Sequence, residues 1–352
     1  MASAWIQNPL MKALRREPAP WTPIWLMRQA GRYLPEYRKL RESVSFLDLC
    51  KTPDLAAEAT VRTVERLGVD AAIVFSDLLL ILEPMGMTLE YSNSKGPVLH
   101  NPIGEPADVE RLAELETVEP LGFVMETVRK SRAALPENVP LIGFAGAPFT
   151  LAAYATEGGS SRDYRRTKSL MFNDTGAWDA LMSRLARAVT LYVNAQIDAG
   201  CQVVQLFDTW AGCLSPDDYR SYVLPHTRSV IESIRSGVPV IHFATGNPSL
   251  LPLLGEAFGK KKPRPAVIGV DWRIRLDDAW RAIGHDKAIQ GNLDPTVLLA
   301  SPIEIRRRAK ELLHQAACRP GHIFNLGHGV LPRTPVENVL ALIEAVHEFS
   351  SR

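Results

Sequence analysis

Short apolar runs recur along this chain, and each is followed by polar or glycine-rich residues and then by a helical pattern. The runs of strand length are Ile24 to Gln29, Ala71 to Ser76, Leu141 to Ala145, Val203 to Phe207, Pro239 to Phe243, Ala266 to Val270, Ala288 to Gly291 and Ile323 to Leu326. They are apolar nearly throughout instead of alternating, which is typical of strands buried on both faces of a parallel sheet. Eight such strands with helices between them predict an α/β fold of the (β/α)8 TIM-barrel type.

An open doubly wound sheet is the alternative α/β arrangement. The first run is not followed by the GxGxxG sequence that binds dinucleotides in many such sheets, and the number of runs favours a closed barrel. The 352 residues would allow two average domains or one large barrel. Because no internal repeat, low-complexity stretch or linker interrupts the chain, we expect a single domain over residues 1–352.

Helical patterns separate the apolar runs at residues 53–67, 176–199, 216–235 and 335–348. The first pattern begins with Pro53 and ends at Gly68, which are residues typical of helix starts and ends. The segment from Asp77 to Leu141 is long for one strand-to-helix connection. We therefore expect an extended connection after the second strand, with a hairpin near Met87 to Leu99 and a helix near 120–134.

Charge and cysteine content exclude several classes of protein. The 40 Lys and Arg residues balance 39 Asp and Glu residues, so the net charge of +1 gives no field for attracting nucleic acid or a membrane surface. No stretch approaches the ~20 apolar residues that span a bilayer, and the N-terminus lacks a signal-type apolar segment. Four widely spaced cysteines without a CxxC pair indicate reduced thiols. We expect a soluble cytoplasmic protein.

A sequence rich in arginine and aromatic residues, MRQAGRYLPEYR, covers residues 27–38 behind the first run. Arg28 and Arg32 are four residues apart, so they would share a face if this segment were helical. Two neighbouring guanidinium groups form a binding site for carboxylates or phosphates. A solvated basic turn is the alternative, and it is the interpretation that we adopt for Arg38 and Arg41.

Polar side chains also follow other runs, at the end of the barrel where TIM-barrel enzymes carry their active sites. Asp77 lies in FSDLL, Tyr154 in GFAGAPFTLAAYATEGG, Asp208 and Thr209 in QLFDTWAG, and His328 in NLGHG. Asp77 and Thr209 could instead cap a helix or turn, Tyr154 could be a core aromatic, and Asp208 is equally compatible with a structural role. The glycines on both sides of His328 indicate close approach by a ligand or by another backbone segment.

The longest of these motifs resemble the uroporphyrinogen decarboxylase family. WLMRQAGRYLPEYR and GFAGAPFTLAAYATEGG are similar to its two signature regions, and FSD, QLFDTWAG and NLGHG follow in family order at similar spacing, from about Pro9 to the C-terminus. The resemblance implies a TIM barrel, commonly a homodimer. It also implies decarboxylation of the four acetates of uroporphyrinogen III, giving coproporphyrinogen III and CO2 in haem and chlorophyll biosynthesis, without a cofactor or a metal.

The resemblance also implies roles for individual residues. Arg28 and Arg32 would bind substrate carboxylates, Asp77 would bind the pyrrole N–H groups, and Thr209 stands where many members of the family have serine. The implied substrate-binding residues are Arg28, Gln29, Arg32, Asp77, Tyr154, Phe207, Thr209 and His328. The implied catalytic residues are Asp77, Arg28, Tyr154 and His328.

Decarboxylation of an acetate beside a pyrrole needs an electron sink. Protonation of the ring carbon that bears the acetate makes a cation that accepts the electrons from CO2 loss, so the ring serves as its own cofactor. Asp77 would stabilise this cation. The proton donor stays open: arginine, with a pKa above ~12, is a poor acid at neutral pH, whereas histidine is better suited. We expect Arg28 to deliver the proton, through a water or a substrate carboxyl group, ahead of His328.

Two other functions are compatible with parts of the sequence. A zinc-dependent corrinoid-type methyltransferase of the same superfamily would need metal ligands near VIHFATG, where His242 is present but Ala244 and Thr245 stand where a thiolate would be needed. A non-catalytic tetrapyrrole-binding protein would have no reason to place an acid, a tyrosine and a histidine at three separate strand ends.

Overall fold

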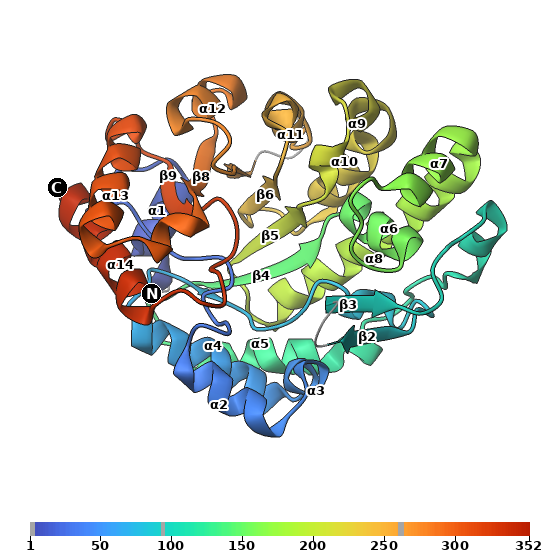
Figure 1. Cartoon of the computed structure of the whole chain (residues 1–352), viewed down its shortest axis with the longest axis horizontal. Coiled ribbons are helices and arrows are strands. Elements are labelled where there is room, and N and C mark those ends of the chain that lie inside the picture. Colours follow the sequence, from blue (N-terminus) through green and yellow to red (C-terminus); the bar gives the residue numbers. More distant parts are fainter. Residues whose placement is uncertain (1–3, 93–95, 260–263) are drawn as a thin grey trace.

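The fold is built around a parallel sheet of seven strands in a computed structural model that describes residues 4–92, 96–259 and 264–352. Neighbouring strands follow the order β1, β4, β5, β6, β7, β8, β9. Their bounds are Ala72–Ile73, Leu141–Gly146, Val203–Asp208, Val240–Ala244, Ala266–Gly269, Ala288–Leu293 and His322–Leu326. The sheet curls, and the helices surround it (Figure 1). The predicted TIM-barrel fold is therefore confirmed.

Residues 23–27 close the barrel between β9 and β1. Ile24 forms a parallel bridge with Phe324 of β9, and the Phe324 N–H donates to the Pro23 carbonyl at 2.8 Å. On the other side, the Asp70 N–H donates to the Ile24 carbonyl at 2.9 Å. The segment occupies the place of an eighth strand, but the prediction of a regular strand from Ile24 to Gln29 is wrong.

Side chains take up the backbone donors that a regular strand would use. The Leu26 N–H donates to Gln29 Oε1 at 3.0 Å, and the Met27 N–H donates to Asn325 Oδ1 at 3.1 Å. The Gln29 N–H donates back to the Leu26 carbonyl at 2.9 Å, which turns the chain. Because these backbone groups already have partners, the ladder to the neighbouring strands ends after one bridge.

The buried carboxylate of Asp70 holds this closure in place. It is 8% exposed and accepts hydrogen bonds from the Ile24 N–H at 2.8 Å and the Trp21 indole N–H at 2.9 Å. Its Oδ2 atom also lies 2.9 Å from Nε2 of His347 on the last helix, α14 (Val336–Ser350). One side chain therefore ties the N-terminal segment and the C-terminal helix to the start of β1.

The helical predictions are confirmed except for one. Helices α4 (Pro53–Leu67), α8 (Thr175–Ala199) and α14 occupy the predicted ranges, and α4 ends at Gly68 with a left-handed φ of 66°. The single helix expected over 216–235 is wrong, because α9 (Pro216–Tyr222) and α10 (Leu224–Ser233) are separate. Pro225 lies in the first turn of α10, and a proline inside a continuous helix would remove a hydrogen bond and clash with the preceding turn.

The connection between β1 and β4 carries several elements. The predicted hairpin is formed by β2 (Leu89–Ser92) and β3 (Gly96–Leu99), which pair antiparallel, and the predicted helix is α5 (Gly122–Ala134). Three short 3-10 helices, η2 (Leu80–Leu82), η3 (Pro106–Arg111) and η4 (Glu119–Leu121), complete the connection. The hairpin is fastened to α6 (Pro148–Glu157), because the Leu99 N–H donates to the Gly158 carbonyl at 2.8 Å.

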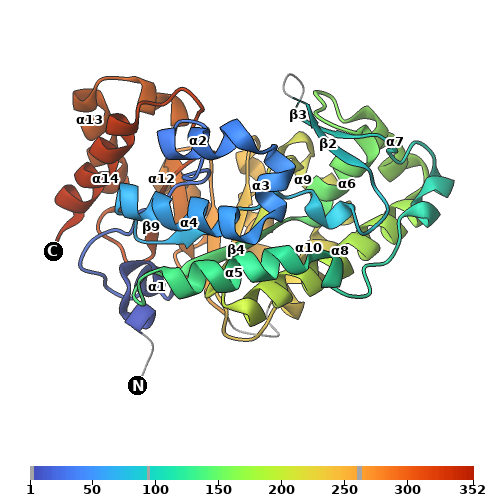
Figure 2. The ribbon, with the colours of Figure 1, turned by 90° about the horizontal axis from the view of Figure 1, so that it is seen from below.

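Helix α1 (Pro9–Leu14) closes the N-terminal end of the barrel. Its apolar residues, including Leu10 and Leu14, form one buried cluster with side chains of the closure segment and the strands, such as Trp25, Ile142 and Ile241. Figure 2 shows α1 and the β2–β3 hairpin at opposite ends of the barrel. The C-terminal ends of the strands therefore form the end at which a ligand can approach, which we call the mouth of the barrel.

The remaining elements lie around this frame. Their bounds are η1 (Ala4–Gln7), α2 (Pro35–Ser43), α3 (Phe46–Lys51), α7 (Arg165–Asn173), η5 (Ala211–Cys213), η6 (Pro248–Leu250), α11 (Leu251–Glu256), α12 (Leu276–Ile283), η7 (Pro295–Leu299) and α13 (Pro302–Ala316). Within the described ranges, no helix has the length and apolar character needed to cross a membrane. The four cysteines are free thiols, as predicted.

Replacing Asp70 should weaken the barrel closure. Asp70→Ala leaves the Trp21 and Ile24 donors buried without partners, so we expect the free energy of unfolding to fall by about 2 to 5 kcal/mol. Thermal and denaturant unfolding would measure this change. Asp179→Ala, which removes an acid that is 74% exposed, is the control and should cost under about 1 kcal/mol. Equal stability of the two variants would contradict the role of Asp70.

Candidate active site

The structure brings most of the predicted site residues to the mouth of the barrel. Asp77 follows β1, Tyr154 lies on α6, Thr209 follows β5 and His328 follows β9, while Arg28 and Arg32 follow the closure segment. Both arginines are exposed, and Asp77, Tyr154, Phe207, Thr209 and His328 are partly accessible. The mouth therefore presents cations, one carboxylate and several neutral donors to a ligand.

Arg28 lies on a tight turn and not on a helix. Its φ of 59° is left-handed, which is uncommon for a residue with a side chain. The turn is close-packed, because a Cβ atom on Gly31 would lie 2.8 Å from the Arg28 carbonyl oxygen. Helix α2 begins only at Pro35, so the expectation that Arg28 and Arg32 share a helical face is wrong. The left-handed residue redirects the chain before a helix can start.

Arg28 is the cation that the other groups at the mouth share. Its charge lowers the pKa of Asp77, of Tyr154 and of His328 relative to the values they would have without it. Arg32 has a different neighbour, because its charge lowers the pKa of Tyr37 on α2. The structure therefore groups Arg28, Asp77, Tyr154 and His328, with Arg32 further along the same exposed turn.

The hydrogen bonds and the nearby cation of Asp77 do not fully offset the cost of burying its carboxylate. Burial raises the pKa of Asp77 above its usual range, although hydrogen bonds from Tyr91 and the Leu79 N–H and the charge of Arg28 act in the opposite direction. The Leu79 N–H donates to Oδ1 at 2.8 Å, so Asp77 also supports the turn before η2. Because burial outweighs these partners, the carboxylate would gain from further N–H donors or from a nearby positive charge.

Tyr91 is a residue of the site that sequence reasoning missed. It lies on β2 of the hairpin, its ring packs on Phe46 of α3 with centroids 4.6 Å apart, and its hydroxyl hydrogen-bonds to Asp77. Burial and the charge of Asp77 both raise the pKa of Tyr91, so the phenol stays protonated and acts as a donor. A search of strand ends could not find it, because the hairpin belongs to a connection.

Tyr154 belongs to an aromatic group with Trp210. The two rings are stacked with centroids 3.7 Å apart at 26°, and Tyr164 meets Trp210 edge-on at 5.3 Å. Burial raises the pKa of Tyr154, and the charge of Asp77 raises it further. Its hydroxyl is therefore a neutral hydrogen-bond donor whose position is fixed by the stacked indole.

His328 is neutral at physiological pH. Its pKa is lowered to about 4, mainly by burial and also by the charges of Arg28 and Arg273, while the charge of Asp271 acts in the opposite direction. The Gly329 N–H donates to Nδ1 at 2.7 Å, so the proton of the neutral ring is on Nε2. His328 therefore offers one Nε2–H donor, and its pKa makes it unsuitable as a proton source near pH 7.

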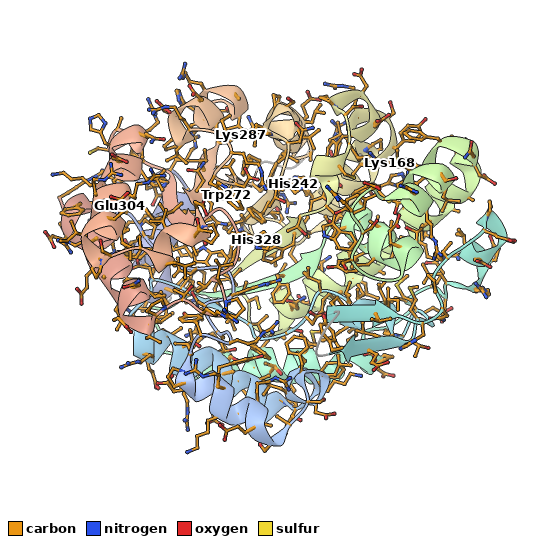
Figure 3. All side chains as sticks on the ribbon, viewed as in Figure 1. Lys168, His242, Trp272, Lys287, Glu304 and His328 are labelled. Carbon is orange, nitrogen blue, oxygen red and sulfur yellow. The ribbon has the colours of Figure 1, made fainter. Side chains whose placement is uncertain are left out.

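Neighbouring groups leave no room for a side chain at either glycine beside His328. The predicted approach of another backbone segment is found at Gly327, whereas Gly329 is approached by the side chain of Arg28. A Cβ atom at Gly327 would lie 2.7 Å from the backbone nitrogen of Trp272, and one at Gly329 would lie 2.4 Å from Cδ of Arg28. Figure 3 shows His328 and Trp272 near the centre of the ring of helices. The loop after β9 is therefore enclosed by the β7–α12 loop and by the turn of Arg28.

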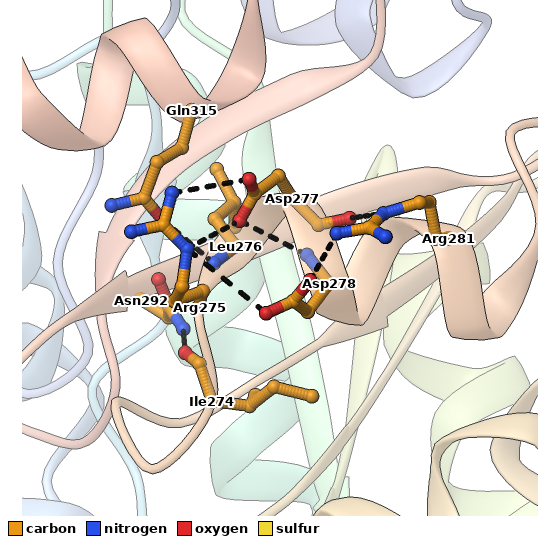
Figure 4. A network of polar contacts seen from close by, with 8 residues as sticks. All are labelled: Ile274, Arg275, Leu276, Asp277, Asp278, Arg281, Asn292 and Gln315. Carbon is orange, nitrogen blue, oxygen red and sulfur yellow. Dashed lines mark hydrogen bonds and ion pairs between the residues drawn. The ribbon is translucent and has the colours of Figure 1, made fainter.

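The β7–α12 loop adds another cation that sequence reasoning did not identify. Asp271, which is buried, accepts the Arg273 N–H at 3.0 Å and pairs with its guanidinium, which lies 4.5 Å from the Trp272 ring centroid. Asn292 of β8 holds the loop through bonds to the Asp271 and Ile274 carbonyls at 2.7 and 2.8 Å. Figure 4 shows the Asn292 bond to Ile274 beside the ion pairs at the start of α12.

Gln29 is placed differently from the other predicted residues. Its side chain is 1% exposed, accepts from the Leu26 N–H at 3.0 Å and donates to the Ala71 carbonyl at 3.1 Å. The backbone carbonyl of Gln29 also accepts a hydrogen bond from the Tyr33 hydroxyl at 2.8 Å. These bonds use the Gln29 amide to hold the arginine turn against the start of β1.

Phe207 and Thr209 lie at the end of β5. The Phe207 ring meets Phe144 edge-on with centroids 5.6 Å apart and Phe243 at 5.9 Å, which leaves one side partly accessible. The Thr209 carbonyl accepts the Thr245 hydroxyl at 2.8 Å, which fixes the loop after β5. Both residues border the mouth, one with an apolar ring and the other with a hydroxyl.

Asp208 belongs to the protein interior. It is fully buried, accepts from the Thr150 hydroxyl at 3.0 Å and the Tyr219 hydroxyl at 3.4 Å, and lies 3.7 Å from Nε2 of His242. These contacts support the structural alternative for Asp208. His242 is itself fully buried, so it does not face the mouth.

No group of three or more His, Cys, Asp or Glu side chains in the described part of the chain could hold a metal ion. Two surface hollows lie away from the mouth. One runs between α8 and α10 beside Arg187 and Arg235, and the other lies beside the start of η3 and α7. Neither contains a predicted site residue.

Comparison with solved structures supports the barrel. A methyltransferase from Methanosarcina mazei has a TM-score of 0.80 at 21% sequence identity, and 98% of each chain is covered. A putative vitamin-B12 independent methionine synthase from Listeria monocytogenes has a TM-score of 0.55 at 13% identity. At these identities the likeness concerns the fold alone.

Sequence comparison reaches further. The family model described as "Uroporphyrinogen decarboxylase (URO-D)" matches residues 7–349. A protein named uroporphyrinogen decarboxylase from Sorangium cellulosum is 52% identical, over 96% of this chain and 95% of its own length. One with the same name from Carboxydothermus hydrogenoformans is 49% identical, over 98% and 97%. Taken with the groups gathered at the mouth of the barrel, these matches show that the chain belongs to the uroporphyrinogen decarboxylase family.

Proposed function

We propose that this protein decarboxylates the four acetate side chains of uroporphyrinogen III, giving coproporphyrinogen III and CO2. The observation that carries the proposal is the group Arg28, Asp77, Tyr154 and His328 at the mouth of a barrel whose sequence matches this family over residues 7–349. The group combines one carboxylate whose pKa is raised by burial with a cation and two neutral donors. A ring with central N–H groups and peripheral carboxylates is complementary to that arrangement.

Arg28 and Arg32 bind peripheral carboxylates of the substrate in this proposal. Both guanidinium groups are exposed, and each charge-assisted hydrogen bond contributes about 1.5 to 3 kcal/mol. The Nε2–H of His328 and the hydroxyls of Tyr154 and Thr209 donate further hydrogen bonds. Phe207 supplies an apolar contact, and Gln29 acts by holding the turn that carries the arginines.

Asp77 binds the pyrrole N–H groups and stabilises the protonated ring. The pKa of Asp77 is raised because burial destabilises the carboxylate more than its hydrogen bonds and Arg28 stabilise it. A positive charge that develops on the substrate ring would supply the missing stabilisation. A counter-charge placed in advance is an effective way to lower the barrier to pyrrole protonation. The electrons of the broken carbon–carbon bond then return to the ring, and reprotonation leaves a methyl group.

Arg28 delivers the proton through a water molecule or through a carboxyl group of the substrate. The lowered pKa of His328 supports this choice, because a neutral imidazole has no acidic proton to give near pH 7. The guanidinium, with a pKa above ~12 in general, would hold and polarise the water or carboxyl that transfers the proton. The reaction requires no cofactor in this proposal, since the substrate ring accepts the electrons.

The direct test is incubation of the purified protein with uroporphyrinogen III under anaerobic conditions, followed by chromatography of the porphyrins. We expect a series of products that have lost carboxyl groups and end at coproporphyrin, with stoichiometric CO2. Binding without any decarboxylation would instead support a tetrapyrrole-binding protein. Stoichiometric zinc together with methyl transfer would support the methyltransferase alternative, although the matching relatives carry the decarboxylase name.

We also propose that the protein is a cytoplasmic homodimer. Each protomer would consist of a single domain over residues 1–352. The dimer follows from the family resemblance, and the four free thiols are compatible with a reducing compartment. Sedimentation equilibrium would determine the oligomeric state, and a mass of 38.9 kDa at all concentrations would contradict a dimer.

Removing the carboxylate of Asp77 should eliminate nearly all turnover. Asp77→Ala removes the counter-charge for the protonated ring, so we expect kcat to fall by at least about 100-fold. Asp77→Glu keeps the charge and should retain a measurable fraction of the activity. Steady-state kinetics would test both variants beside Asp179→Ala, an exposed acid on α8 that should leave the kinetics unchanged. Near-normal activity of Asp77→Ala would contradict the proposed role.

Tyr154→Phe should impair the enzyme without inactivating it. The change removes one donor but keeps the ring stacked on Trp210, so we expect kcat/KM to fall about 10- to 100-fold. Tyr164→Phe changes another tyrosine that contacts Trp210 and serves as the control. Complete loss of activity in Tyr154→Phe alone would make Tyr154 a proton-transfer residue.

His328 should stay neutral from pH 8 to about pH 5. Nitrogen NMR of the imidazole rings should show an Nε2–H tautomer that titrates near the lowered pKa of about 4, with His328→Gln assigning the signal. The unfolded chain binds this proton near pH 6.5, so this residue makes stability fall as the pH drops from about 6.5 to about 4. A charged His328 at pH 7 would restore it as the proton donor.

A further inference from the structure

Where the loop after β9 meets the turn of Arg28, an arginine has a left-handed backbone conformation and a glycine does not. Arg28 has a left-handed φ of 59°, a conformation in which glycine is normally favoured. Gly329, by contrast, has a φ outside the left-handed range, so its backbone conformation is open to any residue. Conformation therefore does not explain why position 329 is a glycine.

Position 329 is a glycine because there is no room for a side chain. A Cβ atom built on Gly329 would lie 2.4 Å from Cδ, 2.7 Å from Cγ and 3.1 Å from Cβ of Arg28. These are carbon atoms of the middle of the side chain, not its mobile end, so the contact cannot be relieved by moving the guanidinium group alone. The aliphatic part of Arg28 runs across the place that a side chain at 329 would fill.

The backbone holds the two segments together at this point. The Val330 N–H donates to the Met27 carbonyl at 2.9 Å, so the residues on either side of the contact are tied to each other. The Gly329 N–H donates to Nδ1 of His328 at 2.7 Å. One glycine thus contacts both Arg28 and His328, which belong to opposite ends of the sequence.

We propose that Gly329 is a positioning residue. Because it has no side chain, the aliphatic part of Arg28 can cross this place and carry the guanidinium group to the mouth of the barrel, and the Gly329 N–H fixes the tautomer of His328. This inference rests on the proposed function for the meaning of the two side chains, but the geometry is independent of it. Gly329 itself does not touch the substrate in this proposal. It acts by setting where the Arg28 charge lies and which nitrogen of His328 carries the proton.

The proposal predicts a specific result for Gly329→Ala. The added methyl group would force Arg28 into another rotamer, while the N–H of residue 329 would remain. We therefore expect loss of the Arg28 interaction with the ligand, and no change in the tautomer of His328. Gly122→Ala is the matched control, because a Cβ atom there meets nothing within 4 Å and the φ is ordinary.

A double-mutant cycle separates positioning of Arg28 from a general structural defect. The variants are Gly329→Ala, Arg28→Ala and the double variant, and the measurement is the dissociation constant of coproporphyrinogen III, titrated anaerobically by tryptophan fluorescence. We expect Gly329→Ala to weaken binding about 10- to 150-fold, which is the contribution of one charge-assisted bond. In the Arg28→Ala background the same change should have little further effect, because Cγ and Cδ are absent and only the contact with Cβ at 3.1 Å remains.

Two outcomes would overturn the proposal. Additive losses in the cycle would mean that Gly329 acts independently of Arg28. A changed His328 tautomer in Gly329→Ala, read from nitrogen NMR of the ligand-free protein, would mean that the loop backbone had moved. The NMR measurement needs no substrate, so it stands even if uroporphyrinogen III is not decarboxylated. Absence of decarboxylation by the unmodified protein would contradict the proposed function and not the packing of Gly329 against Arg28.

Discussion

The barrel of this protein depends on a closure that side chains make where a strand ladder is missing. Asp70 binds the Ile24 N–H on one side of the segment, and Asn325 binds the Met27 N–H on the other. The ladder consists of one bridge at Ile24, and the chain turns out of the sheet after Met27, whose N–H is already bound by Asn325. Arg28 is the next residue, so the closure that completes the barrel also places the shared cation at its mouth.

Burial shifts the pKa values of Asp77 and His328, two of the titratable groups that feel the charge of Arg28, in opposite directions. It raises the pKa of Asp77 and lowers that of His328, because in each case it disfavours the charged form. The charge of Arg28 opposes the first effect and adds to the second. Asp77 is therefore an anion that a positive charge would stabilise, and His328 is a neutral hydrogen-bond donor. These two groups suit a substrate that passes through a cationic intermediate and carries anionic substituents.

Sequence reasoning succeeded where the signal was local and failed where it required contacts between distant segments. The apolar runs located the parallel strands, and glycine spacing identified the crowded loop around His328. The helix over 216–235 was wrong because periodicity outweighed the effect of Pro225. Tyr91 and Arg273 were missed because they lie in connections, and only packing brings the hairpin to Asp77 and the β7–α12 loop to His328.

The sequence by itself determined the barrel, the family and the chemical types of group at the strand ends, since these depend on periodicity and on motifs. Only the tertiary structure decided that Gln29 and Asp208 are committed to internal hydrogen bonds, that Arg28 lies on a left-handed turn, and that His328 is neutral. The physical reason is that pKa values and the availability of donors depend on burial and on neighbours, which segments far apart in the chain supply only after folding.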